Sequence, residues 1–377
     1  MGDAIRKAPK TTLTTRGRLG LWRTASLGAL IVTAAALVTT LVGAAGTEKL
    51  AYDFRAAYFP AAESLLETGS PYSPADEALG DGQEPYVYPP QLAILLVPLT
   101  ALPIDVAAFL AFLGSLAALL AALAVAGVRD PRCFAAVLIW APAFNALEMA
   151  NLSAPLALGV ALAWRYRDVV WQPAIALGTL VSMKLFLWPL LVWAVAMKRY
   201  RVAALATAIG LALTVGAWAV IGLDELASYP DQLARVPDQD SYSIKAVSTS
   251  LGGSPIWGDV LSVIAGGALL GGAVRSGLRG DDFRSFTFAI AAALAFVPVV
   301  WQHYLILLAV PVGIARPRFS AIWLLPIVLW ICPRAANGDD LQPLIPAIVT
   351  MILLTILLAR PQIPFVRRAP LERSATT

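Results

Sequence analysis

The chain has 377 residues, of which 59% are hydrophobic and only 14% are charged, and its mean hydropathy is +0.72. A water-soluble domain of this size needs many more charged residues to cover its surface, so the composition excludes that class. The formal net charge is +4, but the basic residues are scattered between apolar runs, which argues against nucleic-acid binding and makes the charge a signal of membrane topology.

The chain begins with a basic segment, residues 1–23, that precedes an apolar run over 24–45. A secretory signal peptide has the same order of features, but its apolar region is shorter than this one. A run of about 20 apolar residues matches the thickness of a bilayer. We therefore expect a retained first helix over 24–45, preceded by a basic cytoplasmic tail.

Further Ala- and Leu-rich runs follow along almost the whole chain. Because backbone groups in hydrocarbon must be satisfied within a helix or a closed barrel, such runs predict helices. The expected fold class is all-α, a polytopic transmembrane helical bundle with about twelve membrane segments. Several segments are short and closely paired, which is typical of partial crossings or broken helices. The spans are expected at 24–45, 104–126, 133–147, 152–164, 170–183, 185–197, 202–222, 256–274, 285–301, 304–315, 319–333 and 344–359.

The distribution of basic residues predicts the orientation. Of the 28 Lys and Arg residues, 22 fall in segments that this scheme places inside. Lys and Arg favour the cytoplasmic ends of spans, so both termini are expected in the cytoplasm. The protein is thus expected to be a multi-pass protein of the plasma membrane, with a transmembrane domain over 24–359 and a second basic tail over 360–377.

Two outer loops are long, 46–91 and 223–255, and connections of that length are usually functional or disordered. The first loop interleaves aromatic residues with charges, which argues against disorder. The stretch that follows it, 91–102, is apolar but has only about twelve residues, so an interfacial or re-entrant helix is expected there.

Asp53 follows the first span and is the first candidate for a catalytic base, with Arg55 and Tyr58 close to it in sequence. A carboxylate at the edge of a low-dielectric layer loses hydration, which raises its pKa and suits proton abstraction. A solvated loop aspartate is the alternative interpretation.

Other polar residues are expected at the same outer level. Lys184 lies between two apolar runs and would either hold a phosphate group or extend to the interface. His303, the single histidine, would donate or accept a hydrogen bond or bind a metal. Alternatively, it would anchor the chain at the membrane interface beside Trp301 and Tyr304. Three further polar residues are expected at this level, Glu148, Asn151 and Gln302.

The sequence contains no phosphate-loop, dinucleotide-binding, zinc-protease or serine-hydrolase motif. Any transferred group must therefore arrive on a carrier available outside the cytoplasm, and a lipid-linked donor is the natural one. Cys133 and Cys332 are expected near opposite membrane faces, and with a single histidine they offer no structural zinc site. No cofactor is expected.

Three segments of the chain resemble glycosyltransferase family 87. The first starts at Asp53 with DFRAAYFPAAESLLETGSPYSP and continues to YVYPPQLAILLVPLTALP. The second is Lys184 before LFLWPLL, and the third is HYLILLAVP at 303–311. One element departs from the family, which often has Gly-Gln/Asn-x-Asn where this chain has Glu148, Met149, Ala150 and Asn151.

The resemblance implies a GT-C-like membrane enzyme that moves a hexose, with mannose expected, from a polyprenyl-phosphate sugar to a glycolipid or glycan acceptor on the extracytoplasmic side. By resemblance, Asp53 would be the general base of an inverting reaction, and His303 would stabilise the leaving phosphate or orient the donor. Lys184 and Arg55 would hold the donor phosphate. The substrate-binding residues would be Tyr58, Tyr88, Glu148, Asn151, Gln302 and Tyr304.

Some GT-C enzymes bind a divalent metal through paired acidic residues in the first outer loop. The Asp-Phe-Arg sequence at Asp53 offers one carboxylate, so no obligatory metal is expected. Two rival functions stay open. A polyprenyl-phosphate-arabinose-dependent arabinofuranosyltransferase would share the fold. A multi-pass transporter or flippase of sugar or lipid-linked sugar would suit twelve helices, but the sequence shows no internal repeat and few charges at mid-membrane depth.

Overall fold

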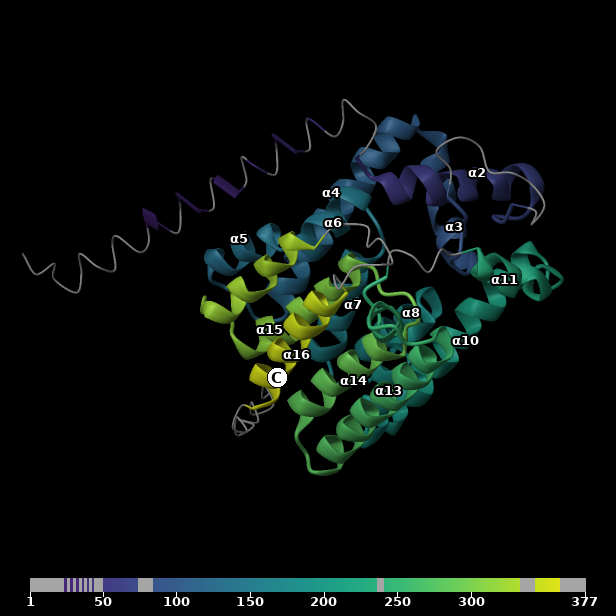
Figure 1. Cartoon of the computed structure of the whole chain (residues 1–377). Coiled ribbons are helices and arrows are strands. Elements are labelled where there is room, and N and C mark those ends of the chain that lie inside the picture. Colours follow the sequence, from purple (N-terminus) through teal and green to yellow (C-terminus); the bar gives the residue numbers. More distant parts are fainter. Residues whose placement is uncertain are drawn as a thin grey trace, which may run out of the picture.

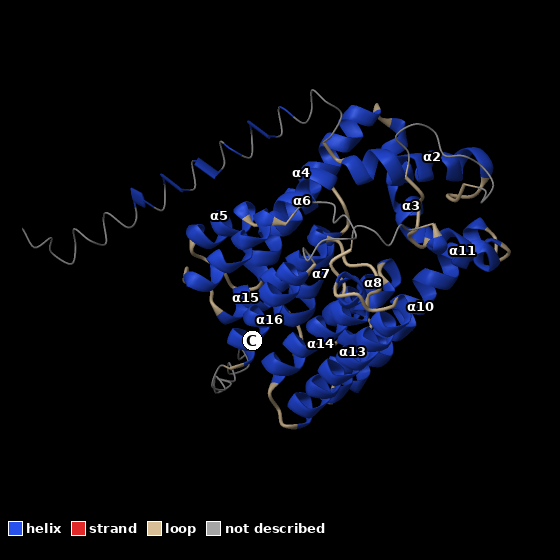
Figure 2. Cartoon of the chain, viewed as in Figure 1, coloured by secondary structure: helices blue, strands red, loops and turns tan. Residues whose placement is uncertain are grey.

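The computed structural model describes residues 50–73, 84–235, 241–332 and 343–359, together with isolated residues between 24 and 43. Every regular element in these ranges is helical and none is a strand (Figure 2). The expected all-α fold is therefore confirmed for the described part of the chain. The first expected span, 24–45, and the tails, 1–23 and 360–377, lie outside the continuously described ranges.

Three helices are long and apolar enough to cross a membrane, and they are α4 (Ile104–Val125), α10 (Tyr200–Ile221) and α13 (Pro255–Leu278). The 22 residues of α4 and of α10 correspond to about 33 Å at 1.5 Å per residue, which matches the hydrocarbon thickness of a bilayer. All three lie where spans were expected. The protein is therefore a membrane protein with several apolar helices.

The expected span 133–147 is wrong as a continuous helix, because it divides into α5 (Pro131–Ile139) and α6 (Ala141–Met149). The backbone is extended at Trp140, with ψ 130°, and Pro142 has no N–H to continue the hydrogen-bond ladder from α5. A second break follows at Ala150, whose φ is +47°, and α7 (Ser153–Arg165) leaves α6 at an angle of 116°.

The remaining apolar helices are shorter than a membrane crossing. By length and composition, three segments qualify as spans, or four if the bent pair α6 and α7 counts as one, so the expected number of about twelve is not confirmed. The short helices do agree with the expectation of broken, closely paired segments. They are α8 (Trp171–Met183), η3 (Leu185–Leu187), α9 (Pro189–Ala196), α14 (Asp282–Phe296), η5 (Gln302–Leu308), α15 (Ala309–Ala315), η6 (Ala321–Ile331) and α16 (Leu344–Leu358).

The two long loops, expected at 46–91 and 223–255, carry short helices of their own. The first contains η1 (Phe54–Tyr58) and α2 (Phe59–Thr68) and is followed by α3 (Pro90–Leu96) and η2 (Val97–Ala101). The second contains α11 (Glu225–Ala234) and α12 (Ile244–Ser250). Figure 1 shows α2 and α3 on the same side of the molecule as α11.

Hydrogen bonds hold these two loops together. The Tyr229 hydroxyl of α11 donates to the carbonyl oxygen of Val87 at 3.0 Å, and the Gln232 side chain donates to that of Ser73 at 2.9 Å. Tyr72 stacks on Trp218 with ring centroids 5.8 Å apart. The first long loop is thus a packed part of the fold wherever the structure describes it.

Candidate active site

Asp53 precedes η1, in a turn that is tied to α6. The backbone N–H of Ala51 donates to the carbonyl oxygen of Glu148 at 2.7 Å, and the Arg55 side chain donates to the carbonyl oxygen of Leu50 at 2.9 Å. Ala51 is fully buried, while Asp53 keeps some accessible surface. The turn therefore fixes the carboxyl group at the point where the first outer loop meets the helical bundle.

Lys184 is a buried cation surrounded by aromatic rings. It lies between α8 and η3, and only 8% of its surface is exposed. Its ammonium group donates to the Tyr304 hydroxyl, and lies 4.0 Å from the ring centroid of Tyr304 and 4.6 Å from that of Tyr88. The faces of aromatic rings attract cations, which offsets part of the cost of burying this charge.

Asp53 and Lys184 lie close enough to affect one another's titration. Burial raises the pKa of Asp53 to about 7, against the opposing effects of the Lys184 ammonium and the Asn151 amide, while Glu84 adds to the rise. Burial lowers the pKa of Lys184 to about 7, against the charge of Asp53. A carboxyl group that titrates near neutral pH is suited to taking a proton from a substrate hydroxyl.

Two tyrosines of the first long loop extend this site. The Tyr58 hydroxyl donates to that of Tyr88 at 2.8 Å, and their rings meet edge to face at 5.0 Å. The Tyr72 hydroxyl donates to the carbonyl oxygen of Tyr88 at 2.9 Å, which holds that residue in place. Of the predicted substrate-binding residues, Tyr88 and Tyr304 thus contact Lys184, and Tyr58 joins them through Tyr88.

His303 lies in the same aromatic cluster and is 5% exposed. Its ring stacks on Trp301 at 5.8 Å and meets Tyr304 edge to face at 4.9 Å. Its Nδ1 lies 3.0 Å from Oδ1 of Asn145, on α6. Sequence reasoning missed Asn145, although it is a polar residue inside an apolar run and lies three residues before Glu148, on the same helical face.

Asn151 lies at the break between α6 and α7 and is 2% exposed. Its Oδ1 accepts a hydrogen bond from the backbone N–H of Ser153 at 2.9 Å, which supports the first turn of α7. Its amide is close enough to Asp53 to lower the pKa of that carboxyl group. Asn151 therefore lies beside the carboxyl group, and its predicted role in substrate binding stays a prediction.

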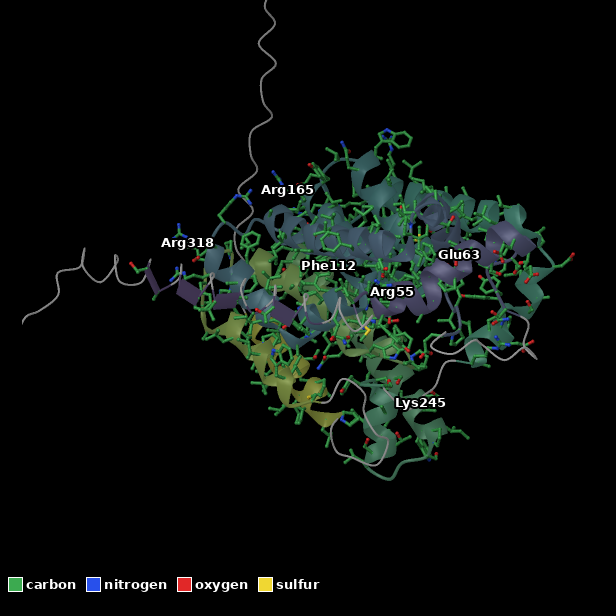
Figure 3. The ribbon with its side chains drawn as sticks, turned by 90° about the horizontal axis from the view of Figure 1, so that it is seen from above. Arg55, Glu63, Phe112, Arg165, Lys245 and Arg318 are labelled. Atoms are coloured by element: carbon green, nitrogen blue, oxygen red, sulfur yellow. The ribbon has the colours of Figure 1, made fainter. Side chains whose placement is uncertain are left out.

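Three predicted residues have other contacts. Arg55, labelled in Figure 3 with Glu63 further along the same segment, forms an ion pair with Asp105 at 2.8 Å. The Gln302 side chain donates to the carbonyl oxygen of Leu329, in η6, at 3.1 Å. Glu148 supplies its backbone carbonyl to the Ala51 bond. These contacts join neighbouring segments of the fold to one another.

Among the residues that the structure describes, no three His, Cys, Asp or Glu side chains lie close enough together to hold a metal ion. Cys133 and Cys332 are both buried and free. Metal independence stays a prediction.

The structure thus brings the Asp53 carboxyl group and the Lys184 ammonium group into one buried site of a helical membrane protein, an arrangement that suits an enzyme of group transfer. The model of glycosyltransferase family 87 matches residues 86–311, more than half of the chain. The chain therefore belongs to glycosyltransferase family 87, and it is a glycosyltransferase. No curated protein and no solved structure gave a significant match.

The family match covers one part of the site and omits another. Lys184, Asn145 and His303 lie inside the matched region, whereas Asp53 precedes it. The family match therefore gives no support for a role of Asp53, and that role is inferred from the position and environment of Asp53 in the fold.

Proposed function

We propose that the protein moves a hexose, with mannose expected, from a polyprenyl-phosphate sugar to a hydroxyl group of a glycolipid or glycan acceptor. The reaction takes place on the extracytoplasmic side of the plasma membrane, in a GT-C-like bundle of about twelve segments with both termini in the cytoplasm. The observation that carries this proposal is the pairing of Asp53, with a pKa raised to about 7, and Lys184, a buried cation.

In the proposed reaction, the Asp53 carboxylate takes the proton of the acceptor hydroxyl as its oxygen attacks the anomeric carbon of the donor. The bond from that carbon to the phosphate oxygen breaks, and its electron pair stays with the phosphate. The products are the glycosylated acceptor, with inverted configuration, and polyprenyl phosphate. Lys184 balances the charge that grows on the departing phosphate, and charge-assisted contacts of this kind are stronger than neutral ones.

Two features of the site support the lipid-linked donor. A buried lysine at the edge of a membrane bundle needs an anionic partner, and a phosphodiester supplies one. The helices α4, α10 and α13 are apolar enough to place the protein in a bilayer, and a polyprenyl chain dissolves in the same bilayer. A polyprenyl-phosphate-arabinose donor meets the same two requirements, so donor testing separates the two sugars. Membership of a glycosyltransferase family counts against a transporter or flippase.

The test uses membranes from a host that lacks the activity, incubated with labelled polyprenyl-phosphate mannose or arabinose, followed by analysis of the lipid products. Asp53→Asn should lower transfer by about 100-fold or more, because an amide cannot accept the proton. Glu63→Gln, which removes an exposed carboxylate from α2, is the matched control and should keep full activity. Full activity of Asp53→Asn would overturn the proposal, and labelled sugar that crosses the membrane without a covalent product would favour a transporter.

A further inference from the structure

The contact between His303 and Asn145 determines which ring nitrogen of His303 carries hydrogen. A neutral imidazole has one N–H donor and one bare nitrogen acceptor. Nδ1 lies 3.0 Å from Oδ1 of Asn145, and a carbonyl oxygen only accepts hydrogen bonds. Nδ1 must then carry the hydrogen, which leaves Nε2 as an acceptor.

The charged form of His303 is disfavoured by its surroundings. The imidazole is buried against the rings of Trp301 and Tyr304, and the Lys184 ammonium lies against the same two rings, 5.8 Å and 4.0 Å from their centroids. A second cation in this cluster would be close to the first and removed from water. The ring is therefore held as the neutral Nδ1–H tautomer.

Nε2 of His303 is itself an unpaired buried atom. It is shielded from solvent and has no hydrogen-bond partner among the residues that the structure describes. Leaving a buried acceptor unpaired costs free energy, and a bound molecule that donates a hydrogen bond recovers it. A fully ionised phosphate carries no hydrogen to donate, so Nε2 is unsuited to the phosphate itself.

We propose that Asn145 is a positioning residue that holds His303 in the Nδ1–H tautomer, so that Nε2 accepts a hydrogen bond from a hydroxyl of the donor sugar. This inference rests on the proposed function, in which Lys184 holds the donor phosphate. The sugar is joined to that phosphate, so its hydroxyls lie within reach of the aromatic cluster that Lys184 and His303 share. His303 would thereby select the sugar, and the leaving phosphate would depend on Lys184.

The tautomer is measured directly by nitrogen NMR. His303 is the only histidine of the chain, so ¹⁵N-histidine labelling of the full-length protein in nanodiscs, purified through a tag without histidine, gives one imidazole pattern. The wild type should show Nδ1 protonated and Nε2 bare at neutral pH. Asn145→Asp keeps an oxygen acceptor and should keep the hydrogen on Nδ1. Asn145→Leu removes the oxygen acceptor and should shift the population toward the Nε2–H tautomer.

The sugar contact is measured with a set of mono-deoxy donors, each lacking one hydroxyl. For wild-type enzyme, loss of one particular hydroxyl should lower kcat/KM about tenfold, as expected for one buried hydrogen bond. For His303→Ala, kcat/KM for the same deoxy donor should lie within about twofold of kcat/KM for the full donor, because the hydrogen-bond partner of that hydroxyl is already absent. Asn145→Leu should reduce discrimination in the same direction, and Asn145→Asp should restore part of it.

Two results would overturn the inference. One is a wild-type imidazole that is protonated on Nε2 at neutral pH. The other is a His303→Ala enzyme that discriminates among the deoxy donors as the wild type does. The NMR measurement needs no turnover, so it stands even if Asp53→Asn keeps activity and the proposed function fails.

Discussion

The backbone N–H of Ala51 donates a 2.7 Å hydrogen bond to the carbonyl oxygen of Glu148. This bond joins the turn that carries Asp53 to the end of α6, the helix whose Asn145 contacts His303. One short helix therefore supports both the proposed base and the proposed sugar-binding histidine. Residues on both sides of the joint have left-handed backbones, with φ +60° at Ala51 and +47° at Ala150.

Substitutions at Ala51 should test whether the left-handed backbone of this turn is needed to position Asp53. Glycine adopts positive φ without strain, so Ala51→Gly should keep transfer activity close to wild type. Valine is β-branched and disfavours this conformation, and the site is fully buried, so Ala51→Val should displace Asp53 and lower transfer by at least about tenfold. Product formation in membranes with matched protein levels checks both variants. Equal activity of the two would show that the turn does not position the base.

The pH dependence of transfer should report the ionisation of Asp53. A general base acts when deprotonated, and burial raises the pKa of Asp53 to about 7, so the rate should rise as the pH increases through that value. Burial also lowers the pKa of Lys184 to about 7, so loss of the Lys184 charge should end this rise at higher pH. The Lys184 charge lowers this pKa and the Glu84 charge raises it. Lys184→Met should therefore move the acidic limb to higher pH, and Glu84→Gln should move it to lower pH. The pH–rate profiles of the wild type and the two variants measure these shifts. A shift of the acidic limb in the same direction for both variants would contradict the assignment of this limb to Asp53.

Asp282, at the start of α14, should be a main stabilising residue of the bundle. Its carboxylate accepts hydrogen bonds from Arg199 at 2.7 and 2.9 Å, Arg167 at 2.9 Å and the Trp193 indole at 2.8 Å. Asp282→Asn removes the negative charge from two partly buried arginines, and the loss should be on the order of 3 kcal/mol of unfolding free energy. Thermal unfolding in detergent measures it.

Asp168 is the matched control for that measurement. It also approaches Arg199, at 3.6 Å, but its side chain is 60% exposed, against 15% for Asp282. Exposed ion pairs contribute little, so Asp168→Asn should change stability by less than about 1 kcal/mol. Equal effects of the two substitutions would show that the burial of Asp282 and its hydrogen-bond partners does not stabilise the bundle.

The packing of α8 against α10 should depend on a glycine. A Cβ added at Gly178 would lie 2.7 Å from the carbonyl oxygen of Ala206 and 2.8 Å from Cβ of Ile209, so the helices would have to move apart. Gly178→Ala should therefore destabilise the protein by about 1–3 kcal/mol. A Cβ added at Gly216, on α10, would meet nothing within 4 Å, so Gly216→Ala should leave stability unchanged or raise it by up to about 1 kcal/mol. Melting temperatures in detergent compare the two, and a stable Gly178→Ala protein would refute the close approach.

Much of the fold was predictable from the sequence where apolar length alone decides the structure. The helices α4, α10 and α13 lie at expected spans because each run is long enough to cross a bilayer and must satisfy its own backbone. The break at Trp140 was not predicted, since an apolar run reads the same whether or not Pro142 interrupts the hydrogen-bond ladder. Arg55 and Gln302 were assigned to substrate, and their observed partners, Asp105 and Leu329, belong to neighbouring helices.

The sequence by itself determined that this is a helical membrane protein of glycosyltransferase family 87, because hydropathy and family motifs are properties of short stretches of chain. Only the tertiary structure decided that Lys184 meets Tyr304, 120 residues away, and that His303 meets Asn145, 158 residues away. Such pairs depend on which helices pack together. The raised pKa of Asp53 has the same origin, since loss of hydration is imposed by the surrounding protein.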